Sequence, residues 1–113
     1  MLLPNADSAI IDPAKLRDYL LSESHPVGRF KARFFRALGF SPERWSELET
    51  ALRTQHLTQP VESTVVRPFG ESSTIRATLT GPVGQSSVVV SVWFRAQGAT
   101  APHLVTAYPG GEK

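Results

Sequence analysis

The hydrophobic period of the sequence changes once, after Pro60, and this change constrains the fold more than any other feature. Before it, apolar residues recur at the spacing of an α-helix, and after it they alternate with polar residues as in a β-strand. A chain of 113 residues is long enough for one core. We therefore expect a single α+β domain over residues 1–113, with a helical half at 1–57 and an antiparallel sheet at 60–109.

The helical half contains start and stop signals for three helices. Asp12, followed by a proline, is typical of a helix start, and Pro26 interrupts the segment that follows. A second helix is predicted over residues 28–39 with a left-handed cap at Gly39, and Ser41 is expected to cap the third. These three N-terminal helices are expected to pack on one side of a four-stranded antiparallel sheet.

Four strands are predicted in the segments VESTVVRPF, STIRATLT, SSVVVSVWFR and HLVTAYP, joined as a meander by turns rich in glycine and proline. Alternation along the third strand places Ser91 and Trp93 on the face that points away from the core. In the fourth strand, Val105 and Ala107 are expected to face the core. The expected open-face residues of that strand are Leu104, Thr106 and Tyr108.

The predicted second helix has an apolar arc and a basic arc. At about 100° per residue, the apolar arc contains Phe30, Phe34, Ala37 and Leu38, and the basic arc contains Arg29, Arg33 and Arg36. Lys31 falls inside the apolar arc, where burying an unpaired charge costs several kcal/mol. Either its stem lies along the apolar surface with the ammonium in water, or an anion pairs with it.

The more specific explanation of the position of Lys31 is an anion-binding site at the start of that helix. The backbone N–H groups of Gly28 and Arg29 would bind a phosphate beside the lysine, as helix N-termini do. His25 precedes them in a short loop, and an imidazole can give or take a proton near neutral pH. A histidine that only caps the helix or bonds a carbonyl fits the sequence equally well.

The composition limits the kinds of reaction and partner that the sequence supports. The chain has no cysteine and no spacing typical of metal ligands, so we expect metal-free chemistry with no cofactor. Between residues 13 and 45, seven basic residues accompany three acidic ones, which suits either a polyanionic partner or a solvated helix face. The sequence has neither a signal-peptide pattern nor an apolar run long enough for a membrane span, and we expect a cytoplasmic protein that does not bind membranes.

Specific motifs lie near both ends of the chain: LPNADSAIIDPAKLRDYLLSESHPVGRFKARFFRALGF and VSVWFRAQGATAPHLVTAYP. In these motifs the chain resembles a bacterial domain-of-unknown-function family that occurs as small stand-alone proteins and at the C-termini of polymorphic toxins. The resemblance covers nearly the whole chain and is most specific from Leu20 to Phe40 and in LVTAYP. It implies a toxin that is neutralised by a cognate antitoxin or immunity protein.

The LVTAYP ending and the order of helices before sheet also resemble the barnase/EndoU/colicin/RelE (BECR) superfamily of metal-independent ribonucleases. Members of that superfamily place His, Lys or Arg, Ser or Thr, and Tyr side chains around an exposed sheet face. The resemblance implies four catalytic candidates: His25, Lys31, Thr106 and Tyr108. The substrate-binding candidates are Gly28, Arg29, Arg76, Thr78, Ser91 and Trp93.

Metal-free RNA cleavage needs a base, a cation for the charge on the phosphate, and an acid for the leaving group. We assign proton transfer to His25 and the cation to Lys31, with Thr106 or Tyr108 holding the phosphate or substrate. A transfer or messenger RNA suits the basic helix face, with Trp93 or Tyr108 as a stacking platform. The alternative is a non-enzymatic module of the immunity or antitoxin kind, whose basic face binds an acidic protein.

Overall fold

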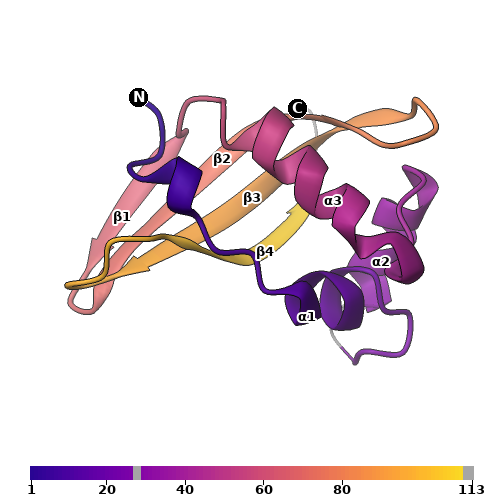
Figure 1. The fold of residues 1–113 in the computed structure, drawn as a ribbon, viewed down its shortest axis with the longest axis horizontal. Helices are drawn as coiled ribbons and strands as arrows, with labels where there is room; N and C mark the ends of the chain where they lie inside the picture. Colours follow the sequence, from indigo (N-terminus) through magenta and orange to yellow (C-terminus); the bar gives the residue numbers. More distant parts are fainter. Residues whose placement is uncertain (27–28, 111–113) are drawn as a thin grey trace.

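The computed structural model describes residues 1–26 and 29–110, in which helical segments precede a four-stranded antiparallel sheet (Figure 1). The order of the strands in the sheet, β1-β2-β3-β4, is their order in the chain. The strands are β1 (Ser63–Arg67), β2 (Gly70–Thr80), β3 (Ser86–Ala96) and β4 (His103–Pro109). The predicted α+β class and the antiparallel meander are therefore confirmed.

The described residues form three α-helices, and two of these continue into a π-helical turn. The α-helices are α1 (Pro13–Lys15), α2 (Arg29–Ala37) and α3 (Trp45–Ala51). The 3-10 turns are η1 (Ala6–Ser8) and η3 (Pro42–Arg44), and the π-helical turns are η2 (Leu16–Leu20) after α1 and η4 (Leu52–His56) after α3. Across the described residues, no helix combines the length and apolar character that crossing a membrane requires.

The predicted helix boundaries rest on local hydrogen bonds. The Asp12 carboxylate accepts a bond from the N–H of Ala14 at 3.0 Å and caps α1. At the end of α2, Gly39 has a φ of +100° and the N–H of Phe40 donates to the Phe35 carbonyl at 3.2 Å, which is a Schellman cap. Ser41 has the extended backbone of a cap residue, but its side chain makes no capping hydrogen bond.

One hydrophobic core lies between the helical segments and the sheet. The helical residues buried in it include Leu16, Leu20, Phe35, Leu48 and Leu52, and the sheet residues include Ile75, Leu79, Val89, Trp93, Leu104 and Ala107. The segment formed by α3 and η4 runs across the sheet and contacts β2 (Figure 1). The other two helices, α1 and α2, contact β4, which is an edge strand. This edge is where the helical half and the sheet bring polar side chains together.

The third strand presents the opposite face from the one predicted. Ser91 and Trp93 are fully buried together with Val89, and their register partners include the core residue Ile75. The expectation that Ser91 and Trp93 lie on an open face is therefore wrong. Both faces of β3 carry valine, so alternation alone does not identify the core face, and Trp93 supplies far more apolar area to it than a valine would.

A β-bulge corrects the prediction for the fourth strand. Val92 pairs with Thr106 and Trp93 pairs with Leu104, so β4 has one extra residue, Val105, at this point. Because of this extra residue, Leu104 and Ala107 are both buried, whereas Val105 is only partly buried. The predictions for Leu104 and Val105 are wrong, and the prediction for Ala107 is confirmed.

The buried side of α2 is also shifted from the predicted arc. Ala32, Phe35 and Leu38 are buried, whereas the side chain of Phe30 is 71% exposed. The buried side of α2 is therefore centred on Phe35 and not on Phe34. This is the side of the helix that packs against η2 and β4. Lys31 precedes Phe35 by one helical turn and therefore lies on the buried side of the helix, as the sequence indicates.

Candidate functional site: a lysine, two hydroxyls and an imidazole

The ammonium group of Lys31 is held by two hydroxyl groups from distant parts of the chain. Its Nζ donates to the phenol oxygen of Tyr19 at 2.8 Å and to Oγ1 of Thr106 at 3.0 Å. The two hydroxyl oxygens are 3.3 Å apart, within hydrogen-bonding distance of each other. Tyr19 belongs to η2, Lys31 to α2 and Thr106 to β4. Lys31 and Thr106, two of the catalytic candidates that the resemblance implies, are therefore in direct contact.

The Tyr19 ring is surrounded by positive charge and by His25. The two rings meet edge to face, with centroids 5.0 Å apart, while the Nζ atoms of Lys31 and Lys15 lie 5.1 Å and 5.4 Å from the tyrosine centroid. Burial by itself would raise the pKa of Tyr19. The hydrogen bonds from Lys31 and Thr106 and the charges of both lysines outweigh that effect, so its pKa lies below the usual phenol value.

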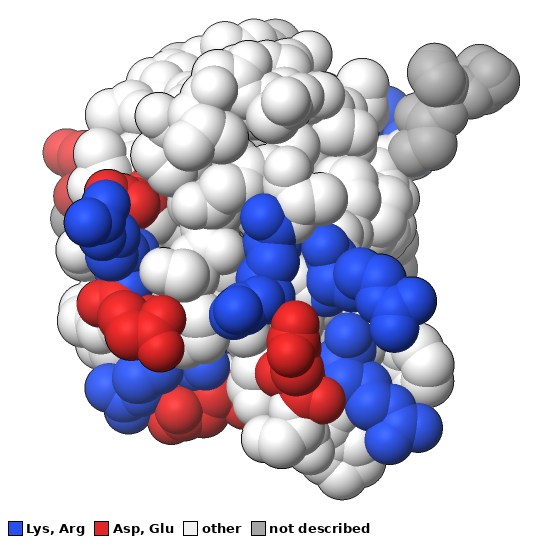
Figure 2. Space-filling model, turned by 90° about the vertical axis from the view of Figure 1, so that its right-hand side faces the viewer, with Lys and Arg blue, Asp and Glu red and all other residues white. Residues whose placement is uncertain are grey.

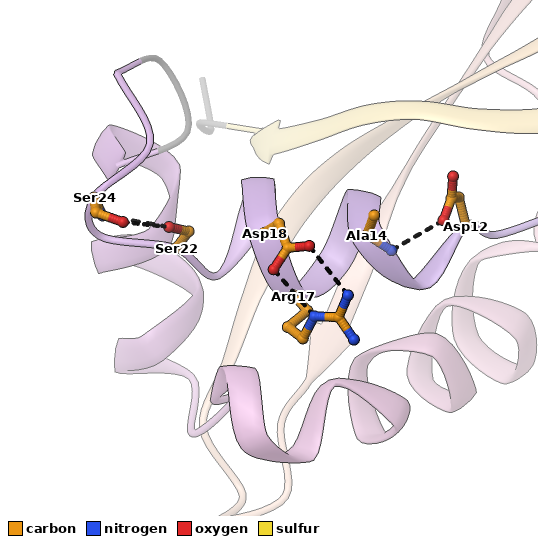
Figure 3. A network of polar contacts seen from close by, with 6 residues as sticks. All are labelled: Asp12, Ala14, Arg17, Asp18, Ser22 and Ser24. Carbon is orange, nitrogen blue, oxygen red and sulfur yellow. Dashed lines mark hydrogen bonds and ion pairs between the residues drawn. The ribbon is translucent and has the colours of Figure 1, made fainter.

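An open cleft of about 700 Å³ lies beside this group of side chains, although Lys31 is not among the described residues that line it. It is lined by Asp12, Ala14, Lys15, Asp18, Tyr19, His25, Val105 and Thr106. The two acids on its rim have other partners: Asp12 caps α1, and Asp18 forms an ion pair with Arg17 at 3.0 Å (Figure 3). The Arg17 hydrogen bond lowers the pKa of the Asp18 carboxyl. Among the described residues, neither carboxylate pairs with Lys31, whose partners are the two hydroxyls.

A second hollow, of about 400 Å³, lies on the outer side of α2 and is lined by Glu23, Arg29, Phe30 and Arg33. Figure 2 shows lysine and arginine side chains interspersed with acidic ones at the helical end of the molecule. Arg36 pairs with Glu23 at 3.0 Å, whereas no described carboxylate pairs with Arg29, whose guanidinium lies 4.8 Å from the Phe30 ring centroid. The candidate Arg29 thus faces this hollow and not the cleft. The candidate Gly28 lies outside the described residues.

Ser91 and Trp93 take part in a buried hydrogen-bond chain. The indole N–H of Trp93 donates to Oγ of Ser91 at 2.8 Å, and that oxygen lies 2.8 Å from Nδ1 of His56. Nε2 of His56 lies 3.2 Å from the Ala77 carbonyl. Because a carbonyl only accepts, Nε2 carries the proton, and Ser91 donates to Nδ1. These side chains are fully buried, so Ser91 and Trp93 do not reach a substrate.

The remaining candidates lie on the sheet face that points away from the core. Arg76 forms an ion pair with Glu62 at 3.1 Å and donates a hydrogen bond to the Gly110 carbonyl. In the sheet, Arg76 on β2 lies opposite Val90 on β3, and Val90 lies opposite Tyr108 on β4. Thr78 is exposed and Tyr108 is 37% exposed. Tyr108 follows Thr106 by two residues on the same side of β4. It is not among the described residues that line the cleft.

Tyr19 and Lys15 are the site residues that the sequence interpretation missed. Tyr19 lies three residues after Leu16, at a spacing that predicts a core position, and its ring is indeed packed against the core. The available signal was its distance of four residues from Lys15, which places the two side chains on one helical face. Within the part of the chain that the structure describes, no group of three or more metal-ligating side chains is found.

Comparison with curated proteins gives no match for this chain, and comparison with solved structures gives none either. A family model does match. It is the model described as Domain of unknown function (DUF6883), and the match extends over residues 2–111, nearly the whole of the 113-residue chain. The predicted membership of a domain-of-unknown-function family is confirmed at that level: the chain belongs to the DUF6883 family.

Proposed function

We propose that the protein is a metal-independent endoribonuclease that cleaves cellular RNA at the cleft beside Tyr19 and Thr106. One observation carries this proposal. The Lys31 ammonium donates to the Thr106 hydroxyl, and Thr106 lines a solvent-accessible cleft together with His25, so three separate segments of the chain converge there. A protein that only binds a partner through its outer helix face has no need of such convergence, whereas a phosphodiester-cleaving site requires it.

The three groups match the demands of RNA cleavage without a metal. Lys31 stabilises the negative charge that develops on the phosphate oxygens, and Thr106 helps to hold the phosphate. His25 takes the proton of the 2′-hydroxyl, which then attacks the phosphorus and yields a 2′,3′-cyclic phosphate and a 5′-hydroxyl. Arg76, Thr78 and Tyr108, on the sheet face that also carries Thr106, extend the surface available to a transfer or messenger RNA.

The resemblance described above supports a toxin role for this activity. HPVGRFKARFFRALGF contains His25 and Lys31, and LVTAYP contains Thr106 and Tyr108, so the motifs shared with polymorphic-toxin C-terminal domains include the residues of the site. The helices-before-sheet order suits a barnase/EndoU/colicin/RelE-like ribonuclease. A toxin of this kind is expressed with a neutralising partner, either an antitoxin or an immunity protein.

The decisive experiment is incubation of the purified protein with total RNA in the presence of EDTA. We expect fragments with 2′,3′-cyclic phosphate ends from the wild type and little cleavage by Lys31→Met. Arg67→Met is a matched control, because Arg67 lies in β1, at the opposite edge of the sheet from β4. Expression of the wild type without its partner should slow bacterial growth, and expression of Lys31→Met should not.

The second candidate is a non-enzymatic binding module, and the outer face of α2 favours it. Phe30 is 71% exposed between Arg29 and Arg33, an arrangement that suits an acidic protein partner. Intact RNA after incubation with wild-type protein at micromolar concentration, together with normal growth on expression, would replace the ribonuclease by this module. Equal cleavage by wild type, Lys31→Met and His25→Asn would keep the ribonuclease and reject the site.

A further inference from the structure

We infer that Tyr19 is the general acid of the proposed cleavage, giving its phenolic proton to the 5′-oxygen that leaves, while Lys31 stabilises the phenolate that remains. The inference rests on the proposed function and adds a catalytic residue to it. Tyr19 lines the cleft, accepts a hydrogen bond from the Lys31 ammonium at 2.8 Å, and contacts the His25 ring.

The polar hydrogens of Lys31, Tyr19 and Thr106 outnumber the hydrogen bonds that these three side chains make with one another. The ammonium of Lys31 has three N–H bonds, of which two point to Tyr19 and Thr106. The two hydroxyls share one hydrogen across their 3.3 Å contact. Among the described residues, one N–H of Lys31 and one hydroxyl hydrogen are left over after these contacts, and the hydroxyl belongs to Tyr19 or Thr106, which both line the cleft. When Thr106 donates to Tyr19, the hydrogen left over is the phenolic one.

The surroundings of Tyr19 make its phenol a better acid than an ordinary tyrosine. Burial raises its pKa, but the hydrogen bonds from Lys31 and Thr106 and the charges of Lys31 and Lys15 bring it below the usual value. A general acid works best when it is still protonated and its pKa is close to the operating pH. The same contacts stabilise the negative charge on the phenolate after the proton has left.

The step balances with the groups already present. The 2′-oxygen bonds to phosphorus as its proton passes to His25, the bond from phosphorus to the 5′-oxygen breaks, and that oxygen takes the proton of Tyr19. The products are a 2′,3′-cyclic phosphate, a 5′-hydroxyl, a phenolate and a protonated imidazole. The two rings are in contact, with centroids 5.0 Å apart, so a water beside them can carry the proton from His25 back to Tyr19, which restores both groups.

Dependence on the leaving group tests the acid role. The substrates are an RNA dinucleotide, whose 5′-alkoxide must be protonated, and a nucleoside 3′-(4-nitrophenyl phosphate), whose phenolate leaves unprotonated. Tyr19→Phe keeps the ring against His25 and Lys15. We expect it to lose on the order of 10²-fold in rate on the dinucleotide and to stay near the wild-type rate on the nitrophenyl ester. Lys31→Met should be slow on both. Equal losses of Tyr19→Phe on the two substrates, or no loss on either, would overturn the inference.

A titration gives a readout that does not depend on cleavage. The chain has two tyrosines, so Tyr108→Phe leaves Tyr19 as the only phenol, and the ultraviolet absorbance of phenolate then follows Tyr19 alone. We expect the phenolate absorbance of Tyr19 to appear at a higher pH in the double variant Tyr108→Phe, Lys31→Met than in Tyr108→Phe alone. An unchanged titration overturns the acid role even if the wild type cleaves RNA. If the wild type cleaves neither substrate, the proposed function fails, and the acid role is overturned with it whatever the titration shows.

Discussion

The Nζ atom of Lys31 lies 3.0 Å from Oγ1 of Thr106, although 75 residues separate the two in the chain. This contact explains how a cation is accommodated on the buried side of α2. Its partners are two neutral hydroxyls, one from Thr106 and one from Tyr19, and no described carboxylate neutralises it. Such a pairing leaves most of the cost of desolvating the ammonium in place. A lysine whose ammonium is held by neutral hydroxyls that line a cleft is better explained by function than by stability.

Lys31→Met should therefore separate activity from stability. Methionine fills a similar volume without a charge, so we expect the melting temperature to stay the same or to rise. The rate of the proposed RNA cleavage should fall on the order of 10²-fold or more, because the substitution removes the cation to which we assign stabilisation of charge on the phosphate. Differential scanning fluorimetry and initial rates on one RNA substrate measure both effects. A large fall in melting temperature, absent in Arg67→Met, would show that the lysine is structural.

Ser91→Ala should destabilise the protein and leave the active cleft intact. The substitution removes the hydroxyl group that accepts from the Trp93 indole and donates to His56, and both partners are fully buried. Leaving buried polar groups without partners costs about 1–3 kcal/mol of unfolding free energy. Urea unfolding measures this loss, with Ser87→Ala in the same strand as control. Reduced RNA cleavage by folded Ser91→Ala would contradict the assignment of Ser91 to the core.

The stability of the protein should fall between pH 7 and pH 5 because of His56. Burial lowers the pKa of this imidazole, and the hydrogen bond to the Ala77 carbonyl offsets only part of that effect. Its Nδ1 accepts from Ser91, so a second ring proton would break that bond. The unfolded chain, with an ordinary imidazole of pKa near 6.5, binds the proton more readily. Acid therefore favours unfolding, by up to about 2 kcal/mol over this range.

Urea unfolding at several pH values checks this prediction. In His56→Gln the free energy of unfolding should be lower at pH 7 but should change less between pH 7 and pH 5. His103→Gln is the control, since His103 is an exposed histidine on β4. A slope that is the same in wild type and His56→Gln would show that His56 is not the group responsible.

Gly81→Ala should disturb the link between α2 and the turn that joins β2 to β3. A Cβ atom at Gly81 would collide with the backbone carbonyl of Leu38, at the end of the helix that carries Lys31. Gly84→Ala, in the same turn, meets no atom but has a φ of +92°, which costs about 1–2 kcal/mol. We expect a larger loss of unfolding free energy for Gly81→Ala than for Gly84→Ala. Equal losses would mean that the turn moves away from Leu38 without cost.

Features that depend on neighbouring residues could be predicted from the sequence. The change of period at Pro60, the Asp12 cap and the Gly39 cap each depend on residues within one turn, and the structure has the helices, strands and cap hydrogen bonds that they indicate. The core face of β3 could not be predicted in this way. Apolar residues occupy both of its faces, and the buried position of Ser91 depends on His56, a partner 35 residues away.

The residues of the candidate site also differ in whether local sequence could predict them. The sequence by itself determined that Lys31 is unusual, because a charge among apolar residues at helical spacing is a local contradiction. Only the tertiary structure decided which groups meet it. The bulge at Val105 sets how β4 continues to Thr106, and the packing of η2 against α2 brings the Tyr19 hydroxyl to the same ammonium. These contacts depend on how distant segments pack together, which the spacing of residues along the chain does not encode.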